Sequence, residues 1–301
     1  FFLQFQYFYC LSLDLILFHS NMMTKDQLIP QYSIQTLIIM SENMTVTEDR
    51  EKIIEIYKTN VHGKKPDTKN FNQRHDGKQG HWLEDAIGSK RDASNAPDLF
   101  GFEIKNHTRQ KVTFGDWSPN YWIFTDKDYG ITRDDFLKIF GKPNEAKNNR
   151  LSWSGEPIPN IKGTNSFGLK IIITKNNDIS FVYSYSKDQR SNKSSLVPKK
   201  MQTEDLTIAK WNGSGQKSLK EKVEKKFNVK GWAKCSQDSE GRYDSIGFGS
   251  PMSFETWIGH VKTGEIYYDS GMYQGNSRNY CQWRANNTFW NNRIVHRYPK
   301  L

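Results

Sequence analysis

The chain has 301 residues, of which 36% are hydrophobic and 25% charged, which excludes an intrinsically disordered protein. Its formal net charge of +10 favours a polyanionic partner, above all nucleic acid. The three cysteines lie far apart, which argues against a zinc cluster and a disulfide framework and favours a reducing cytoplasm.

Residues 1–44 are expected to be a non-native or disordered leader. The first part, 1–23, is apolar, but it has no basic start and no small-residue cleavage site. Asp14 interrupts it, and it is short for a membrane span. Because the chain begins with Phe1, we interpret this part as translated upstream sequence, with a cryptic signal peptide as the alternative. The candidate starts are Met22, Met23, Met40 and Met44.

The next elements in chain order are a helix, a loop and a second helix. Apolar residues recur at helical spacing behind acidic residues over 47–60, which predicts an amphipathic helix. The segment 61–80 is polar and rich in Gly, Lys and Asp, so it is expected to be a long loop. A short helix follows and is predicted to end at Gly88.

The rest of the chain is expected to consist mainly of strands. Strands are predicted at 99–106 and 111–117, a hairpin at 169–186, a basic amphipathic helix at 218–229, and a second hairpin at 254–270 that turns at 262–264. Helices and strands mix without a regular alternation, which predicts an α+β fold. The Ser- and Lys-rich segment 187–200 is the predicted linker between a catalytic lobe, 45–186, and a DNA-recognition lobe, 187–301.

Asp98, Glu103 and Lys105 form the main candidate for a catalytic site. Glu103 and Lys105 are two positions apart on a predicted strand, so both point to one face, while Phe102 and Ile104 point to the other. Asp98 lies in a proline-containing turn that can bring it back beside Glu103. Two carboxylates at one spot repel each other, and a divalent cation with oxygen ligands, such as Mg²⁺, relieves that repulsion. Lys105 could then hold the attacking water or stabilise the transition state of phosphodiester hydrolysis.

An ordinary half-exposed strand with alternating charges is the alternative for these residues. Glu84, on the preceding predicted helix, bears on the choice because a helix packed beside the strand could aim it at the same metal. The alternative for Glu84 is a solvated helix acid.

The order of these features resembles the MvaI/BcnI family of type II restriction endonucleases, closest to its LlaMI-like members, and is similar to the mismatch-repair nickase MutH. The shared features are a Gly-rich loop, a helix with Leu-Glu, then Pro-Asp, then Gly-x-Glu-x-Lys, and the similarity runs from about residue 47 to the C-terminus. The resemblance implies a PD-(D/E)xK core, a mixed sheet flanked by helices, with a second DNA-recognition lobe. It also implies catalytic roles for Asp98, Glu103, Lys105 and Glu84, with Asp98 and Glu103 binding the metal.

The segment 269–290 is dense in Arg, Asn, Gln, Tyr and Trp. Arg can pair bidentately with guanine, and Asn or Gln with adenine. The resemblance supports this segment as the recognition region, and a polar loop packed by its aromatics is the alternative. The candidate DNA-binding residues are Arg278, Arg284, Asn276, Tyr280 and Gln282. Trp283 and Trp290 are expected to be core residues.

Two histidines and one charge run complete the candidates for DNA binding. His107 follows the active strand and could touch a phosphate, with a structural role as the alternative. His260, on the strand predicted within 254–270, could approach a groove, although a core or surface position is the stronger interpretation. The basic run 217–226 either contacts phosphates or forms a solvated helix face.

The first functional hypothesis is a Mg²⁺-dependent, sequence-specific endonuclease acting on double-stranded DNA within a restriction–modification system, with Mn²⁺ able to substitute. The resemblance implies a short pseudopalindromic site of the CC-N-GG type and a monomer. The expected location is the cytoplasm, without membrane association. A cognate DNA methyltransferase would be its genetic partner. The alternatives are a MutH-like repair nickase and a DNA-binding protein with a catalytically inactive core.

Overall fold

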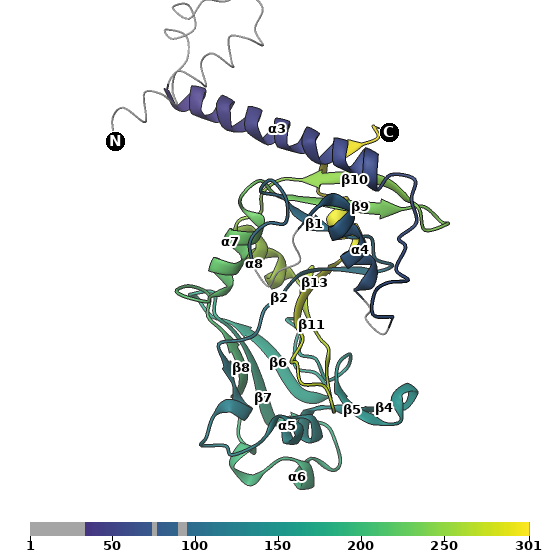
Figure 1. Cartoon of the computed structure of the whole chain (residues 1–301). Coiled ribbons are helices and arrows are strands. Elements are labelled where there is room, and N and C mark those ends of the chain that lie inside the picture. The colour runs from purple at the N-terminus through teal and green to yellow at the C-terminus, as the bar shows by residue number, and fades with distance from the viewer. Residues whose placement is uncertain (1–33, 74–76, 90–94, 301) are drawn as a thin grey trace, which may run out of the picture. The chain divides into compact units, whose positions relative to one another are not determined.

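The computed structural model describes residues 34–73, 77–89 and 95–300, which divide into two compact units at Asn60 and Val61. The first unit is described as one helix, α3 (Ile34–Asn60) (Figure 1). It confirms the helix predicted over 47–60 but begins earlier, so the last part of the expected leader is helical. The rest of that leader lies outside the described residues. No helix within the described ranges is long and apolar enough to cross a membrane.

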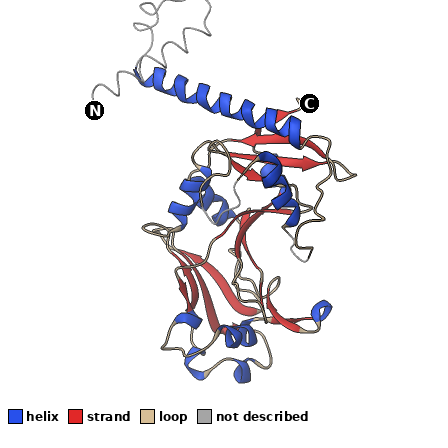
Figure 2. Ribbon diagram, viewed as in Figure 1, coloured by secondary structure: helices blue, strands red, loops and turns tan. Residues whose placement is uncertain are grey.

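The described residues of the second unit form four β-sheets (Figure 2). The first sheet has the order β1 (Glu103–Lys105), β9 (Trp232–Gln237), β10 (Tyr243–Gly249), β14 (Ile294–Tyr298). The second sheet is β11 (Ile266–Ser270), β13 (Cys281–Asn286), β2 (Lys111–Asp116), and the third is β12 (Met272–Tyr273), β5 (Arg150–Trp153), β4 (Lys142–Asn144). The fourth is β3 (Tyr121–Trp122), β8 (Leu206–Trp211), β7 (Ile179–Asp188), β6 (Phe167–Ile173), which contains the predicted hairpin.

The first sheet is mixed, because it contains both parallel and antiparallel strand pairs. β1 is parallel to β9, with Glu103 beside Trp232 and Lys105 beside Lys234, whereas β9, β10 and β14 are antiparallel to one another. A mixed sheet accompanied by helices confirms the predicted α+β class. β1 therefore pairs with a strand from the C-terminal half of the chain.

The helices of this unit are short and are ended by their caps. They are α4 (Lys78–Ile87), α5 (Arg133–Phe140), α6 (Lys193–Leu196), α7 (Leu219–Phe227), α8 (Phe254–Thr263) and α9 (Asn287–Asn291), with 3₁₀ turns at Ile123–Thr125, Glu145–Lys147 and Lys199–Met201. Gly88 ends α4 in the left-handed conformation, as predicted. The Ser218 side chain caps α7, which confirms the helix predicted over 218–229.

The prediction of a hairpin over 254–270 is wrong in its first half, which is the helix α8. Its buried residues Phe254, Trp257, Ile258 and Val261 recur at helical spacing, and the Ser253 side chain accepts a hydrogen bond from a backbone N–H of the first turn. The Lys-Thr-Gly sequence is compatible with a hairpin turn, but here Gly264 adopts a φ of 79° and ends the helix. Only β11 is a strand here.

The segment 187–200 does not link separate sheets. It leaves β7 and returns to β8, and these strands are antiparallel neighbours in one sheet. Val197 and Met201 are buried in the same core as that sheet. The segment is therefore a connection within one sheet that contains the short helix α6, and the division into a catalytic lobe and a DNA-recognition lobe stays a prediction.

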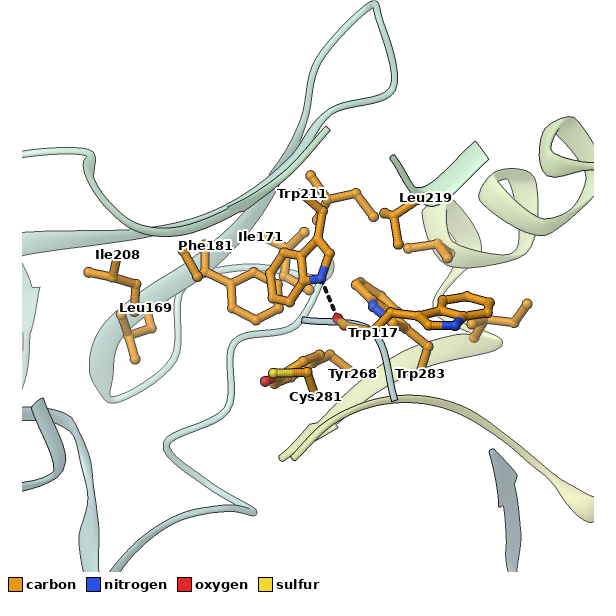
Figure 3. Close-up of a cluster of buried hydrophobic side chains, with 14 of the residues drawn as sticks. Trp117, Leu169, Ile171, Phe181, Ile208, Trp211, Leu219, Tyr268, Cys281 and Trp283 are labelled. Atoms are coloured by element: carbon orange, nitrogen blue, oxygen red, sulfur yellow. Dashed lines mark hydrogen bonds between the residues drawn. The ribbon is translucent and has the colours of Figure 1, made fainter. Parts of the chain in front are cut away.

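The core of the second unit is unusually aromatic. Figure 3 shows part of it, where the Trp211 indole N–H donates to the Trp117 carbonyl oxygen over 2.7 Å. Trp211 lies edge-on to Trp283, with 5.6 Å between ring centroids. Trp283 and Trp290 are fully buried, which confirms their prediction as core residues. These contacts join β8 to β13, so the fourth sheet and the second sheet share one core.

Candidate active site

A tight turn brings Asp98 back beside β1, the strand that carries Glu103 and Lys105. Leu99 and Phe102 exchange two backbone hydrogen bonds of 3.1 and 2.8 Å, and the residues between them, Phe100 and Gly101, have φ of 48° and 85°. Positive φ at both central positions is the geometry of a type I′ turn. As a result, one Asp98 carboxylate oxygen accepts a hydrogen bond from the Ile104 backbone N–H over 2.8 Å. The expected return of Asp98 beside the strand is confirmed.

Glu103 and Lys105 are buried side chains. Their exposed fractions are 3% and 8%, and the Lys105 Nζ lies 2.6 Å from Glu103 Oε1. Phe102, also buried, meets the Phe248 ring edge-on at 5.6 Å. The half-exposed strand with alternating charges is therefore excluded. Because burying ionised groups is costly, a buried carboxylate and ammonium at one place are a common sign of a functional site.

A second lysine reaches the same carboxylate. Lys226 of α7 places its Nζ 3.1 Å from Glu103 Oε1, and 15% of its side chain is exposed. The other oxygen, Glu103 Oε2, is buried and has no hydrogen-bond partner within the described part of the chain. Lys226 belongs to the basic run whose sequence left two interpretations open. No pattern in that run distinguishes which of its lysines faces β1.

Burial and neighbouring charges shift the proton affinities of this cluster. Burial, followed by the negative charge of Glu103, raises the pKa of Asp98 to about 6. Lys105 and Lys226 oppose that rise. Burial also lowers the pKa of Lys105, and the positive charge of Lys226 acts in the same direction. Both shifts mean that burial disfavours the charged forms of Asp98 and Lys105, so holding them charged at this place costs the folded state free energy.

The two carboxylates fit a hard divalent cation. The oxygen-only donor set is the kind that Mg²⁺ prefers, and the buried, unpartnered Oε2 of Glu103 is an available ligand atom. Among the described residues, no group of three or more His, Cys, Asp or Glu side chains could hold a metal, so Glu84 does not complete a triad with Asp98 and Glu103. The end of its helix is nearby, because the Ser89 hydroxyl donates to the Asp98 carbonyl oxygen over 3.3 Å.

A polar cleft of about 720 Å³ lies over the β11–β13–β2 sheet. Gln282 and Arg284 of β13 face it, while their neighbours Cys281, Trp283 and Ala285 are buried on the other side. β2 connects the cleft to the cluster of Glu103 and Lys105, since Lys111 and Thr113 line the cleft and the Phe114 carbonyl accepts a hydrogen bond of 3.4 Å from Lys105. In Figure 1, β2 and β13 run between the β9–β10 hairpin and the β6–β8 sheet. The side chains that line the cleft include Lys111, Arg150, Tyr273, Tyr280, Gln282 and Arg284.

Asp269 fixes the direction of two basic side chains in this cleft. Its Oδ2 lies 2.5 Å from the Lys111 Nζ and 3.0 Å from the Arg284 Nε. Arg284 also donates to the side-chain oxygen of Gln282 over 3.1 Å. These side chains come from three adjacent strands, and the sequence pattern pointed only to Gln282 and Arg284 of β13. Lys111 and Asp269 lie in different parts of the sequence, so their pairing could not be predicted.

Two other predicted DNA-binding residues lie at the edge of the cleft. Arg278 is exposed, pairs with Asp116 at 2.7 Å, and stacks over the Tyr280 ring at 5.1 Å. The Asn276 side chain instead holds its own loop, because it donates to the Gly271 carbonyl over 3.1 Å and accepts from Arg133. Asn276 therefore has a structural role, whatever else it contacts.

The two histidines lie outside the cleft lining. His260 is on the helix α8 and not on a strand as predicted, and its Nδ1 is 2.7 Å from Glu265 Oε2. Arg293 lies beside the same ring, at 3.3 Å from its Nε2. His107 is half-buried, and burial together with Lys234 lowers its pKa. Its Nδ1 is buried and has no hydrogen-bond partner in the described ranges.

Comparison with known proteins identifies the fold and then the family. The structure of the restriction endonuclease MvaI with its cognate DNA substrate matches with a TM-score of 0.52 at 17% identity, over 84% of this chain and 96% of that chain. This likeness defines the class as a restriction-endonuclease-like fold. The type II restriction enzyme ScrFI of Lactococcus lactis subsp. cremoris is 48% identical over 264 residues, which are 82% of this chain and 97% of ScrFI. The LlaMI restriction endonuclease family model matches residues 61–298, so the chain belongs to this family and is a type II site-specific deoxyribonuclease.

Proposed function

We propose that the enzyme uses Mg²⁺, with Mn²⁺ as a substitute, to cut both strands of double-stranded DNA at a short pseudopalindromic CC-N-GG-like site. The observation that carries the chemistry is the cluster of half-buried Asp98 with the buried Glu103 and Lys105. Asp98 and Glu103 supply carboxylate oxygens at one place, as a cation bound to a DNA phosphate requires. When bound, Mg²⁺ would polarise the phosphate and lower the pKa of a water molecule.

Lys105 has the geometry of an active-site cation. Its ammonium group is held by Glu103 and by the Phe114 carbonyl, so it points in one fixed direction. Burial lowers its pKa, which brings it closer to a group that can exchange a proton with the attacking water. As a cation it would also stabilise the charge that develops on the phosphate. Glu84 is proposed only as an assisting residue at the end of α4.

The cleft over the β11–β13–β2 sheet is the proposed DNA-recognition surface. A three-stranded sheet presents there Gln282, Arg284 and Lys111, which are donors suited to base edges in the major groove. Tyr280 lines the same cleft, and Arg278 stacks against it. DNA in the MvaI complex is the cognate substrate of that protein, and we extend DNA binding to this chain on the basis of family membership. His107 is retained as a candidate for a phosphate contact.

We further propose a cytoplasmic monomer that acts beside a cognate DNA methyltransferase. The two described cysteines, Cys235 and Cys281, are free and buried, as is common in a reducing compartment. Membership in a restriction endonuclease family favours this hypothesis over the MutH-like nickase and the inactive DNA-binding protein.

The decisive experiment is digestion of a supercoiled plasmid with purified enzyme, Mg²⁺ and no partner protein. Unassisted double-strand cuts at fixed positions are expected, and sequencing of the ends gives the site. Single nicks that need a partner protein would support the nickase, and DNA binding without cutting in Mg²⁺ or Mn²⁺ would support the inactive protein. Lys105→Ala should keep DNA binding and lose cleavage by at least about 10²–10³-fold, as removal of one positioned electrostatic group does. Near-normal cutting by this variant would refute the assignment.

A further inference from the structure

The buried carboxylate of Glu103 pairs with two ammonium groups, although one would balance its charge. Its Oε1 accepts both Lys105 at 2.6 Å and Lys226 at 3.1 Å. Either ammonium group alone would balance Glu103. With Asp98 included, the cluster has two carboxylates and two ammonium groups, so it is formally neutral without any metal. A divalent cation entering this cluster would make it doubly positive unless one lysine moves away.

Lys226 is the lysine that is able to move. It reaches the site from α7, which is anchored through its buried residues Leu219 and Phe227, and part of its side chain is exposed. Lys105, by contrast, is also held by the Phe114 carbonyl and lies over the Phe227 ring at 5.2 Å. A flexible four-carbon stem lets a lysine exchange one anionic partner for another nearby.

A DNA phosphate would be within reach of such an exchange. If Asp98 and Glu103 hold a cation that contacts the scissile phosphate, then a group bonded to Glu103 is next to that phosphate as well. The phosphate would bring negative charge to the place where the entering cation creates an excess of positive charge.

We propose that Lys226 couples metal binding to DNA binding. In the metal-free enzyme the ammonium group of Lys226 is paired with Glu103. When the DNA complex forms, this ammonium group pairs with a phosphate instead, and the Glu103 carboxylate becomes free to bind the cation. This inference rests on the proposed metal-dependent nuclease function. Since binding free energies are reciprocal, DNA raises the affinity for the cation and the cation raises the affinity for DNA. Lys226 is a positioning residue in this scheme, because it acts on the cation through Glu103.

The test measures Ca²⁺ affinity by calorimetry, because Ca²⁺ occupies such sites without turnover of the DNA. Lys226→Met removes the charge and keeps the stem, and Lys226→Gln keeps a donor for Glu103 in case the first variant does not fold. Lys225→Met is the matched control, since Lys225 is the exposed neighbour on the same helix and loses the same charge. Each protein is titrated alone and with a short DNA duplex containing CC-N-GG.

Without DNA, both Lys226 variants are expected to bind Ca²⁺ about tenfold more tightly than wild type, within the range of typical coupling energies. Their enhancement of Ca²⁺ affinity by DNA should shrink by the same factor, while Lys225→Met behaves as wild type. Wild-type Ca²⁺ affinity in both Lys226 variants, or an equal gain in the control, would overturn the role of Lys226 even if wild type cleaves DNA. Absence of cation binding and of cleavage in wild type would overturn the proposed function as well.

Discussion

Replacement of Asp98 by Asn should stabilise the metal-free protein although it abolishes cleavage. The pKa of Asp98 rises from 3.8 to about 6, mainly because burial and Glu103 disfavour its ionised form. At about 1.4 kcal/mol per pKa unit, the ionised carboxylate costs the folded state about 3 kcal/mol. Asn removes this cost and can still accept the hydrogen bond from Ile104 through its amide oxygen. The free energy of unfolding should therefore increase by up to about 3 kcal/mol at pH 8.

The increase in the free energy of unfolding caused by Asp98→Asn should depend on pH, and this dependence identifies the ionisation of Asp98 as its cause. A carboxyl whose pKa is raised in the folded state stabilises the protein fully below pH 3.8, and this contribution is lost as the pH rises through about 6. The advantage of Asp98→Asn over wild type should thus be complete above about pH 7 and shrink toward pH 4.5. Urea unfolding in EDTA across this range measures it, with Asp244→Asn as a control at an exposed position. A variant less stable than wild type at pH 8, or a difference that does not change with pH, would refute the reasoning.

Three further substitutions test the turn, the cleft and a histidine. Gly101→Ala should destabilise the protein by about 1–2 kcal/mol in thermal unfolding, because its φ of +85° is left-handed and the new Cβ would lie 3.1 Å from Lys230 side-chain atoms. Asp269→Asn should weaken binding to the cognate duplex and strengthen binding to unrelated DNA in gel shifts, because Arg284 loses its fixed direction while the cleft loses a negative charge. His260→Gln should leave DNA affinity unchanged in the same gel shifts, since its ring is engaged on α8.

Each of these expectations has a contrary outcome. An Ala at 101 without loss of stability would mean that the turn tolerates an ordinary residue. If binding of cognate and unrelated DNA increased equally, Asp269 would act only by repelling DNA phosphates and not by orienting Arg284. A DNA-binding defect in the His260 variant, with unchanged stability, would mean that His260 contributes to DNA recognition.

The sequence by itself determined the composition of the active strand. The Pro-Asp turn, followed by Glu103 and Lys105 on one side of a strand, was sufficient to predict which side chains gather, because these contacts are local. Buried helices and strands with regular spacing, such as α7 and the β6–β7 hairpin, were predicted for the same reason. The hairpin over 254–270 failed because its glycine could serve either as a turn or as a helix cap.

Only the tertiary structure decided what surrounds that strand. Lys226 reaches Glu103 from 123 positions further along the chain, and Asp269 joins Lys111 to Arg284 across three strands. Charged residues at the surface and at a buried site look alike in a sequence, because burial depends on which distant element packs over them. The alternation of the segment containing Glu103 was therefore equally compatible with a half-exposed strand and with a buried one. The structure decides for the buried strand, because β9 pairs with it and α7 packs against it.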